Sequence, residues 1–77
     1  MMKELLEAIV KPLVRNPEEV NIAVSEREDA IVLALSVNPS DMGKVIGKQG
    51  RIAKAIRTVM RAAAKKDGKK VIVDIVE

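Results

Sequence analysis

The stretch Val45–Ile52, which reads VIGKQGRI, decides how this sequence is interpreted. Gly47 and Gly50 bracket two polar residues, an apolar pair precedes them, and a basic amphipathic segment follows. Because glycine has no Cβ atom, a Gly-x-x-Gly turn between helices lets its backbone lie against a sugar-phosphate chain. A helix that begins at such a turn also directs its N-terminal N–H groups and the positive end of its dipole toward the bound group. The stretch therefore predicts a turn between two helices that is suited to a phosphate backbone.

Basic residues are concentrated around this turn. Residues 42–66 contain eight Lys and Arg residues and no Asp or Glu. The formal charge is −4 before this segment, +8 within it and −1 after it, so the total of +3 conceals a strongly basic region. This asymmetry favours a polyanionic partner. A run of charges alone is more often a solvated helix face, but its position beside the glycine turn favours nucleic acid.

Composition excludes several classes of protein. The 77 residues suffice for one domain, and a hydrophobic content of 48% predicts that it folds. The chain has no Cys and no His, so we expect no disulfide, no metal site, no other cofactor and no histidine general base. It has no aromatic residue on which a base could stack. Glutamates in the N-terminal apolar pattern argue against a signal peptide, and no apolar run could span a bilayer, so we expect a cytoplasmic protein with no membrane association.

Catalysis is not expected. A nucleotide-binding P-loop needs Gly-x-x-x-x-Gly-Lys-Ser/Thr, and here Met42 stands at the first position and Gln49 at the last. The carboxylates are scattered, with Asp41 in the first turn of a predicted helix, Asp67 in a turn and Asp74 on an exposed strand face. No pairing of a base with a nucleophile is visible, so we predict no catalytic residues.

Hydrophobic periodicity and turn residues predict six elements in the order helix, strand, strand, helix, helix, strand, and hence an α+β fold. These elements cover residues 2–15, 19–25, 30–37, 39–46, 50–66 and 70–76. Pro12 should loosen the last turn of the first helix. The first two strands should pair as an antiparallel hairpin across the charged turn 26–29. Gly47 and Gly68 suit the left-handed ends of the second and third helices.

Alternation along each strand predicts which residues pack against the core. The inward residues are expected to be Val20, Ile22, Val24, Ile31, Leu33, Leu35, Val37, Val71, Val73 and Ile75. The longest helix carries one narrow stripe of polar and basic residues, Arg51, Lys54, Thr58, Arg61 and Lys65. Its apolar residues lie opposite this stripe. Arg57 lies off the stripe and is expected to be a solvated charge.

This arrangement resembles a KH domain of type II, in which a Gly-x-x-Gly loop joins two helices within one three-stranded domain. The resemblance covers essentially the whole chain. It implies a single KH domain over residues 1–77, with a three-stranded sheet covered on one face by three helices. Segments 9–13 (IVKPL) and 55–58 (AIRT) also resemble the small stand-alone bacterial KH proteins of the KhpA type.

The resemblance implies binding of single-stranded RNA, with about four nucleotides clamped along the loop, in a post-transcriptional regulator or RNA chaperone. The glycines would allow close backbone approach, Lys48 and Gln49 would project toward phosphates, and Ile46 would help to floor the groove for the bases. The flanking cations would add electrostatic attraction. Gly43 provides either packing space for a helix or room for the RNA. The expected RNA-binding residues are thus Gly43, Lys44, Ile46, Gly47, Lys48, Gln49, Gly50, Arg51 and Lys54.

A second surface is expected on the longest helix, because its apolar arc spans about 200° whereas a core-facing stripe needs little more than about 100°. The KH pattern would turn Ala53, Ile56 and Met60 toward the sheet. Four apolar residues would remain near the surface as a dimer interface: Ile52, Ala55, Val59 and Ala63. The partner would be a second copy or another KH-containing protein. Two alternatives stay open: the core covers more of the helix, or the chain is a KH-fold interaction module with little RNA binding of its own.

Overall fold

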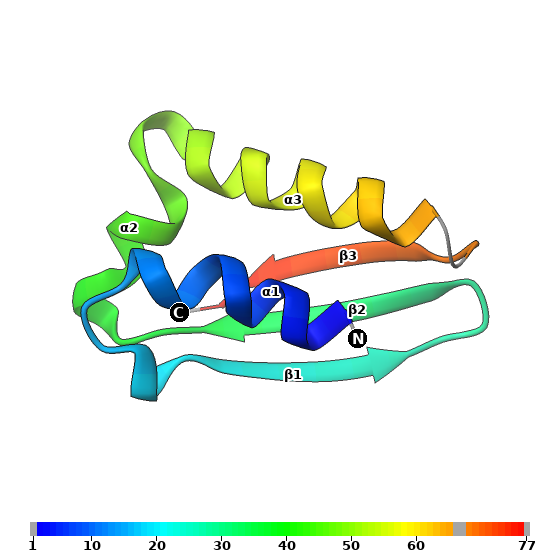
Figure 1. Cartoon of the computed structure of the whole chain (residues 1–77), viewed down its shortest axis with the longest axis horizontal. Coiled ribbons are helices and arrows are strands. Elements are labelled where there is room, and N and C mark those ends of the chain that lie inside the picture. The colour runs from blue at the N-terminus through cyan, green and yellow to red at the C-terminus, as the bar shows by residue number, and fades with distance from the viewer. Residues whose placement is uncertain (1, 66–67, 77) are drawn as a thin grey trace.

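The computed structural model describes residues 2–65 and 68–76 of the chain (Figure 1). The α-helices are α1 (Met2–Val10), α2 (Met42–Ile46) and α3 (Arg51–Ala64), and the strands are β1 (Asn21–Glu26), β2 (Ala30–Ser36) and β3 (Lys70–Ile75). Short 3-10 turns occupy residues 11–13, 17–19, 39–41 and 48–50. The predicted order of elements and the α+β class are confirmed. None of the described helices is long and apolar enough to span a membrane.

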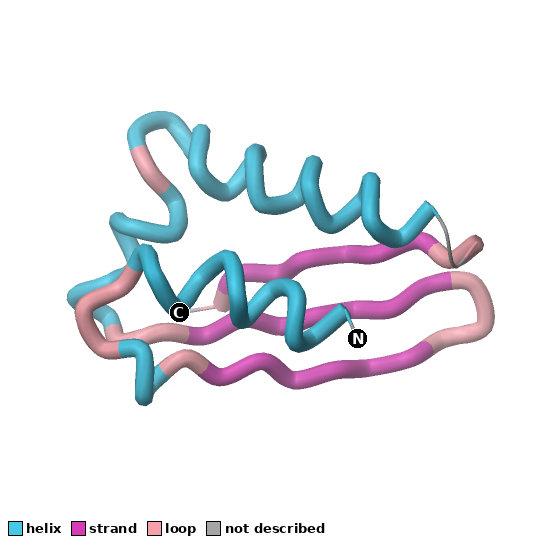
Figure 2. Tube along the Cα trace, in the orientation of Figure 1, coloured by secondary structure: helices cyan, strands magenta, loops and turns pink. Residues whose placement is uncertain are grey.

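The strands form one mixed sheet in the order β1-β2-β3. β1 and β2 pair antiparallel, with Ile22 opposite Leu35, which confirms the predicted hairpin. β3 pairs parallel to β2, with Val73 opposite Leu33, a pairing that the sequence pattern did not predict. Parallel neighbours require a long crossover, which α2 and α3 provide. The three helices lie together on one side of the sheet (Figure 2). Within this layer α3 packs over β3, and α1 packs over the hairpin.

One hydrophobic core fills the space between the helices and the sheet. Its largest fully buried apolar residues come from every helix and from the central strand: Leu6, Val10, Leu33, Leu35, Val45 and Met60. Ile22, Val71 and Val73 are also buried, as the alternation predicts. The prediction is wrong for Val24, which is 50% exposed. Val24 lines an open hollow together with Met2 and Lys3 from the first turn of α1, so that turn does not cover it.

The first helix and the first strand are both shorter than predicted. α1 ends at Val10 rather than Arg15, because Pro12 has no N–H donor and the chain continues in a 3-10 turn. β1 begins at Asn21, because residues 17–19 form a second such turn. The connection between α1 and β1 is therefore longer than the sequence suggests, and it packs beside α2.

The end of α3 agrees with the sequence as far as the structure describes it. Gly68 has a φ of 71°, the left-handed conformation predicted for a residue that stops a helix. Lys66 and Asp67, predicted as the last helical residue and the turn, lie outside the described residues. β3 then begins at Lys70 and returns beneath α3.

Candidate nucleic-acid interface

The Gly47–Gly50 loop joins α2 to α3 in a conformation that only glycine suits at its first position. Gly47 has φ 73° and ψ 177°, a region of backbone space that is essentially restricted to glycine. A Cβ atom there would lie 2.7 Å from Cγ1 of Ile52. Gln49 and Gly50 are both left-handed, with φ 57° and 73°, and a Cβ on Gly50 would meet no atom within 4 Å. Gly47 is thus required by both conformation and packing, and Gly50 by conformation alone.

These differences predict a graded series of alanine substitutions. Gly47→Ala should lower the free energy of unfolding by about 2–3 kcal/mol, because it combines backbone strain with a clash. Gly50→Ala should cost about 1–2 kcal/mol, the cost of a left-handed alanine. Gly43→Ala should be neutral or stabilise by up to about 1 kcal/mol, because α2 has helical backbone there and nothing lies within 4 Å. Urea unfolding measures all three, and equal losses for Gly47 and Gly50 would contradict the role of Ile52.

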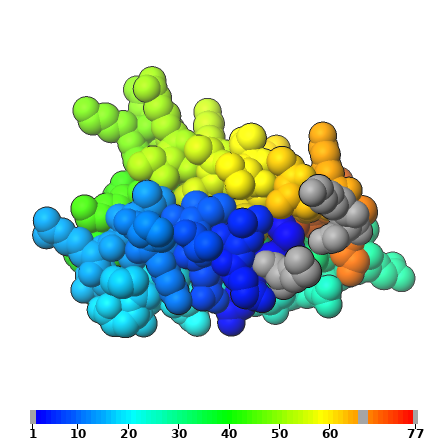
Figure 3. Space-filling view, in the orientation of Figure 1, coloured from blue at the N-terminus to red at the C-terminus, as the bar shows by residue number. Residues whose placement is uncertain are grey.

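The polar side chains of the loop and its flanks face solvent. Lys48 and Gln49 are exposed at the tip of the loop. Three basic residues of the flanking helices are exposed as well: Lys44, Arg51 and Lys54. Figure 3 shows long side chains that project from the region where α2 meets α3. Ile46 is half-buried and packs against the core, so it supports the loop from beneath and offers only part of its surface. The structure therefore brings the residues expected from the sequence to one end of the molecule.

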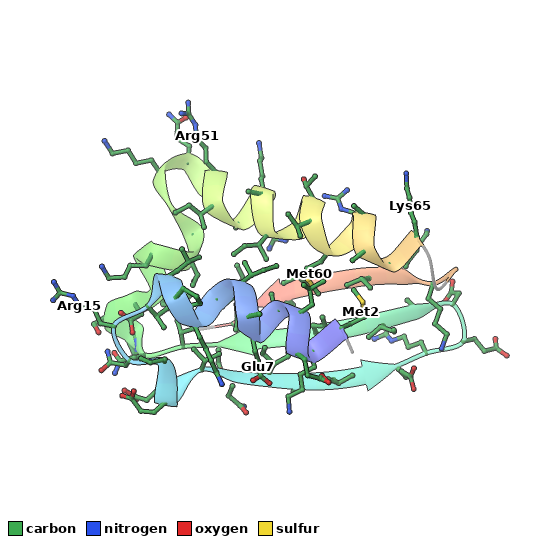
Figure 4. All side chains as sticks on the ribbon, viewed as in Figure 1. Met2, Glu7, Arg15, Arg51, Met60 and Lys65 are labelled. Atoms are coloured by element: carbon green, nitrogen blue, oxygen red, sulfur yellow. The ribbon has the colours of Figure 1, made fainter. Side chains whose placement is uncertain are left out.

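α3 presents two opposite faces, as its periodicity predicts. Ala53, Ile56, Met60 and Ala64 are buried against the sheet. The opposite side is exposed and carries four cations, Arg51, Lys54, Arg61 and Lys65, which we call the basic ridge. Figure 4 shows its two ends, Arg51 and Lys65, projecting away from the sheet. The ridge begins at the residue that follows Gly50, so it continues directly from the loop.

Arg57 is not the solvated charge that the sequence suggested. It is half-buried, and its Nε–H group donates a hydrogen bond to the carbonyl oxygen of Val73, at 3.1 Å. β3 is an edge strand, so this guanidinium occupies an acceptor on the free edge of the sheet. Between α3 and β3 lies an open groove of about 420 Å³, lined by Arg57, Arg61, Lys70, Val71, Ile72 and Val73. The only feature of the sequence that could have indicated this groove is the spacing of Arg57 and Arg61, which are one helical turn apart.

Comparison with known proteins identifies the family. The family model described as KhpA/KhpB, KH domain, matches residues 3–75. The chain belongs to this family of KH domains. The helices on one face of a three-stranded mixed sheet, with the Gly47–Gly50 loop between α2 and α3, agree with the type II KH fold expected from the sequence.

Curated relatives match over nearly their whole length. The RNA-binding protein KhpA of Clostridium perfringens is 61% identical over 75 residues, which cover 97% of this chain and 100% of the relative. The RNA-binding protein KhpA of Listeria monocytogenes is 53% identical over 76 residues, covering 99% and 100%. The protein of the same name from Aquifex aeolicus is 45% identical over 76 residues, covering 99% and 96%.

The KH domain also has an exposed apolar surface, on the side of α3 away from β3. Of the four residues expected there, Ala55 and Val59 are exposed, and Ile52 and Ala63 are half-buried. α1 and the turn after it add Ile9 and Leu13, which the sequence analysis missed. Together these helices border an open groove of about 320 Å³. We define the apolar face as the four expected residues together with these two: Ile9, Leu13, Ile52, Ala55, Val59 and Ala63.

A buried carboxylate holds α2 in place. Asp41 is fully buried and accepts hydrogen bonds from the N–H groups of Arg15 and Asn16 and from the Asn16 side-chain amide, at 3.0–3.1 Å. Asn38 caps the 3-10 turn 39–41 that leads into α2, because its side chain accepts a hydrogen bond from the N–H group of Ser40. Asp41 is therefore an anchor between the α1–β1 connection and α2, not the ordinary first-turn residue that the sequence suggested.

The same contacts set the charge state of this anchor. Burial alone would raise the pKa of Asp41, but the donors from Arg15 and Asn16, with the nearby charge of Lys44, hold its pKa below the usual value. A carboxylate with a lowered pKa stabilises the fold above its ordinary titration range and loses that effect as the pH falls through the lowered value. The anchor is therefore fully ionised at neutral pH. No group of acidic residues within the described parts of the chain is placed to hold a metal ion.

Proposed function

We propose that this protein binds single-stranded RNA and clamps about four nucleotides against the Gly47–Gly50 loop. The observation that carries the proposal is the loop itself, because Gly47 is held without a Cβ atom while every flanking cation faces solvent. The relatives named as RNA-binding proteins support the same assignment. On this proposal the whole of residues 1–77 acts as one KH domain.

The residues have separate roles in this proposal. Gly47 and Gly50 allow the sugar-phosphate chain to approach the backbone, and Gly43 leaves the surface of α2 open, since nothing lies within 4 Å of its missing Cβ. Lys48 and Gln49 contact phosphates at the tip. Three cations attract the strand from either side of the loop, Lys44, Arg51 and Lys54. Ile46 supports the floor on which the bases lie.

The binding should depend strongly on salt. Neutralising a phosphate on a single strand gives a slope of about −0.7 in a plot of log K against log salt, so four phosphates predict a slope of about −2.8 and a loss of about 50-fold between 50 and 200 mM. Fluorescence anisotropy of a labelled single strand measures this. A duplex of the same sequence, whose bases cannot enter the clamp, should bind more weakly. A flat titration would contradict the proposal.

We further propose that two copies associate through the apolar face. Val59 and Leu13 are 48% and 40% exposed on this face, and the small Ala55 beside them allows a second helix to approach. Self-association of this kind is two-fold and would place two Gly47–Gly50 loops on one particle. Two loops on one particle can hold two RNA segments, which suits a post-transcriptional regulator or an RNA chaperone. A second KH-containing protein is the other partner that would fit the same face.

A further inference from the structure

We propose that the basic ridge of α3 extends the RNA-binding surface beyond the clamp, so that its far half, Arg61 and Lys65, holds phosphates of nucleotides outside the segment clamped at the Gly47–Gly50 loop. The proposal rests on the RNA binding proposed above and extends it to the part of the strand beyond the clamp. The observation that supports it is a set of four exposed cations on the side of α3 that faces away from the sheet: Arg51, Lys54, Arg61 and Lys65.

The ridge differs from an ordinary solvated helix face in having no acidic residue. A solvated face commonly carries Glu and Lys four residues apart, as α1 does with Glu7 and Lys11, whose charged atoms are 3.1 Å apart. α3 contains no Asp or Glu. No salt bridge to a ridge cation is found in the part of the chain that the structure describes. These cations therefore have nothing within the described protein to neutralise them.

This arrangement costs helix stability. Arg61 and Lys65 are four residues apart, and Arg51 and Lys54 are three apart, so each pair is a pair of neighbouring like charges. Like charges at these spacings destabilise a helix by a few tenths of a kcal/mol per pair. The hydroxyl of Thr58, which lies between the two pairs, donates inward to the carbonyl oxygen of Lys54 at 2.9 Å. Only the four positive charges are therefore presented outward, and a polyanion is the ligand that would relieve their repulsion.

The length and position of the ridge separate it from the clamp. Arg51 and Lys65 are fourteen residues apart, which corresponds to about 21 Å along a helix. A stacked strand with phosphates about 3.4 Å apart would pass about six nucleotides over that distance, more than the four of the clamp. Arg61 lines both the α3–β3 groove and a shallow hollow that it shares with Thr58, Ala62 and Lys65. The far half of the ridge is thus continuous with the groove yet distant from the loop.

The rest of the surface favours this path for a long strand. Residues 1–41 carry a formal charge of −4, and the exposed carboxylates of this part, such as Glu18 and Glu28, repel phosphates. On net charge, an RNA held at the loop is therefore attracted more strongly toward α3 than toward residues 1–41. The ridge would add affinity for RNAs longer than the clamped segment and little for RNAs that just fill the clamp.

The test compares RNA lengths in two matched variants. One carries Arg61→Gln and Lys65→Gln, which remove the far half of the ridge. The control carries Lys3→Gln and Arg27→Gln, which remove two exposed cations elsewhere and change the net charge equally. Anisotropy is measured with single strands of two lengths. The short strand has about five nucleotides, close to the length of the clamped segment, and the long strand has about fifteen, enough to reach the end of the ridge. A third variant, Thr58→Lys, adds a cation to the middle of the ridge.

The expected result is a loss confined to the long RNA. At 0.1 M salt each phosphate contact multiplies the association constant by about five relative to 1 M salt, so the ridge variant should bind the long strand about 25-fold more weakly, with a salt slope smaller by about 1.4. Its affinity for the short strand should stay the same, the control should match the unmodified protein, and Thr58→Lys should bind the long strand about fivefold more tightly.

Other outcomes overturn the inference. Equal losses for both lengths would place Arg61 and Lys65 in the clamp itself. Equal losses for the ridge variant and the control would mean that net charge alone matters. Unchanged binding of the long strand would mean that the ridge only keeps the helix solvated. Failure of the unmodified protein to bind either strand would instead contradict the proposed function, so the two failures are distinguishable.

Discussion

Replacing Lys48 and Gln49 together by Asp should abolish RNA binding while the fold survives. Both side chains are exposed at the tip of the loop, and the left-handed φ of 57° at position 49 is one that Asp tolerates well. The double variant removes a cation and places two carboxylates where phosphates should lie. Losing one contact costs about fivefold at 0.1 M salt, and each new repulsion of about 1 kcal/mol costs a similar factor. The combined loss should exceed about 100-fold.

The control for this experiment is Arg27→Asp with Ala8→Glu, which makes the same change in net charge at exposed sites far from the loop along the chain. Circular dichroism and urea unfolding should show that both variants are folded. A folded Lys48→Asp, Gln49→Asp protein with unchanged RNA affinity would show that the loop is not the binding site. The alternative of a KH-fold interaction module would then become the better explanation of this chain.

Local patterns in the sequence were sufficient to predict most of the fold. The alternation that predicts Leu33, Leu35, Val71 and Val73 as core residues depends only on the period of a strand, and all four are buried. The amphipathic character of α3 follows from its helical period in the same way. The positive φ of Gly47 was predicted because a helix end with positive φ favours glycine strongly, but its ψ of 177° lies outside the left-handed region that the sequence predicted. These are features that neighbours in the sequence determine.

Long-range contacts were the part that the sequence did not reveal. Asp41 bonds to residues 25 and 26 positions away, and nothing in its local setting distinguishes it from an exposed first-turn residue. Arg57 reaches Val73, sixteen residues away, only because α3 crosses the free edge of a strand that is parallel to its neighbour. Leu13 joins the apolar face because Pro12 ends α1 early. Each of these depends on which elements become neighbours, which periodicity cannot specify.

Replacing Val59 by Asp should dissociate the proposed dimer without unfolding the domain. Val59 is 48% exposed in the single chain, so an aspartate there remains hydrated in the monomer. In the dimer two such carboxylates would be buried against each other and against apolar neighbours. Burying an unpaired charge costs several kcal/mol, so the dissociation constant should rise by more than about 1,000-fold. Sedimentation or light scattering over a range of concentrations measures it.

The structure provides a matched control in Val24→Asp. Val24 is 50% exposed, so it loses a similar apolar surface on substitution, but it lies on β1 and not on the apolar face. It should leave the association unchanged. The RNA measurements then separate avidity from intrinsic affinity. Val59→Asp should bind a strand with one site normally, and it should bind a strand with two sites far more weakly than the dimer does, because the second loop is no longer held nearby.

The oligomeric state of the unmodified protein decides what the apolar face is for. A single domain of this size with Val59 and Leu13 exposed side by side on one face has more apolar surface than its own core uses. If the unmodified protein is monomeric at high micromolar concentration, self-association is wrong. Val59→Asp would then have to be tested against another KH-containing protein. In that case the same substitution should weaken the mixed complex, because the two proposals require the same face and differ only in the partner.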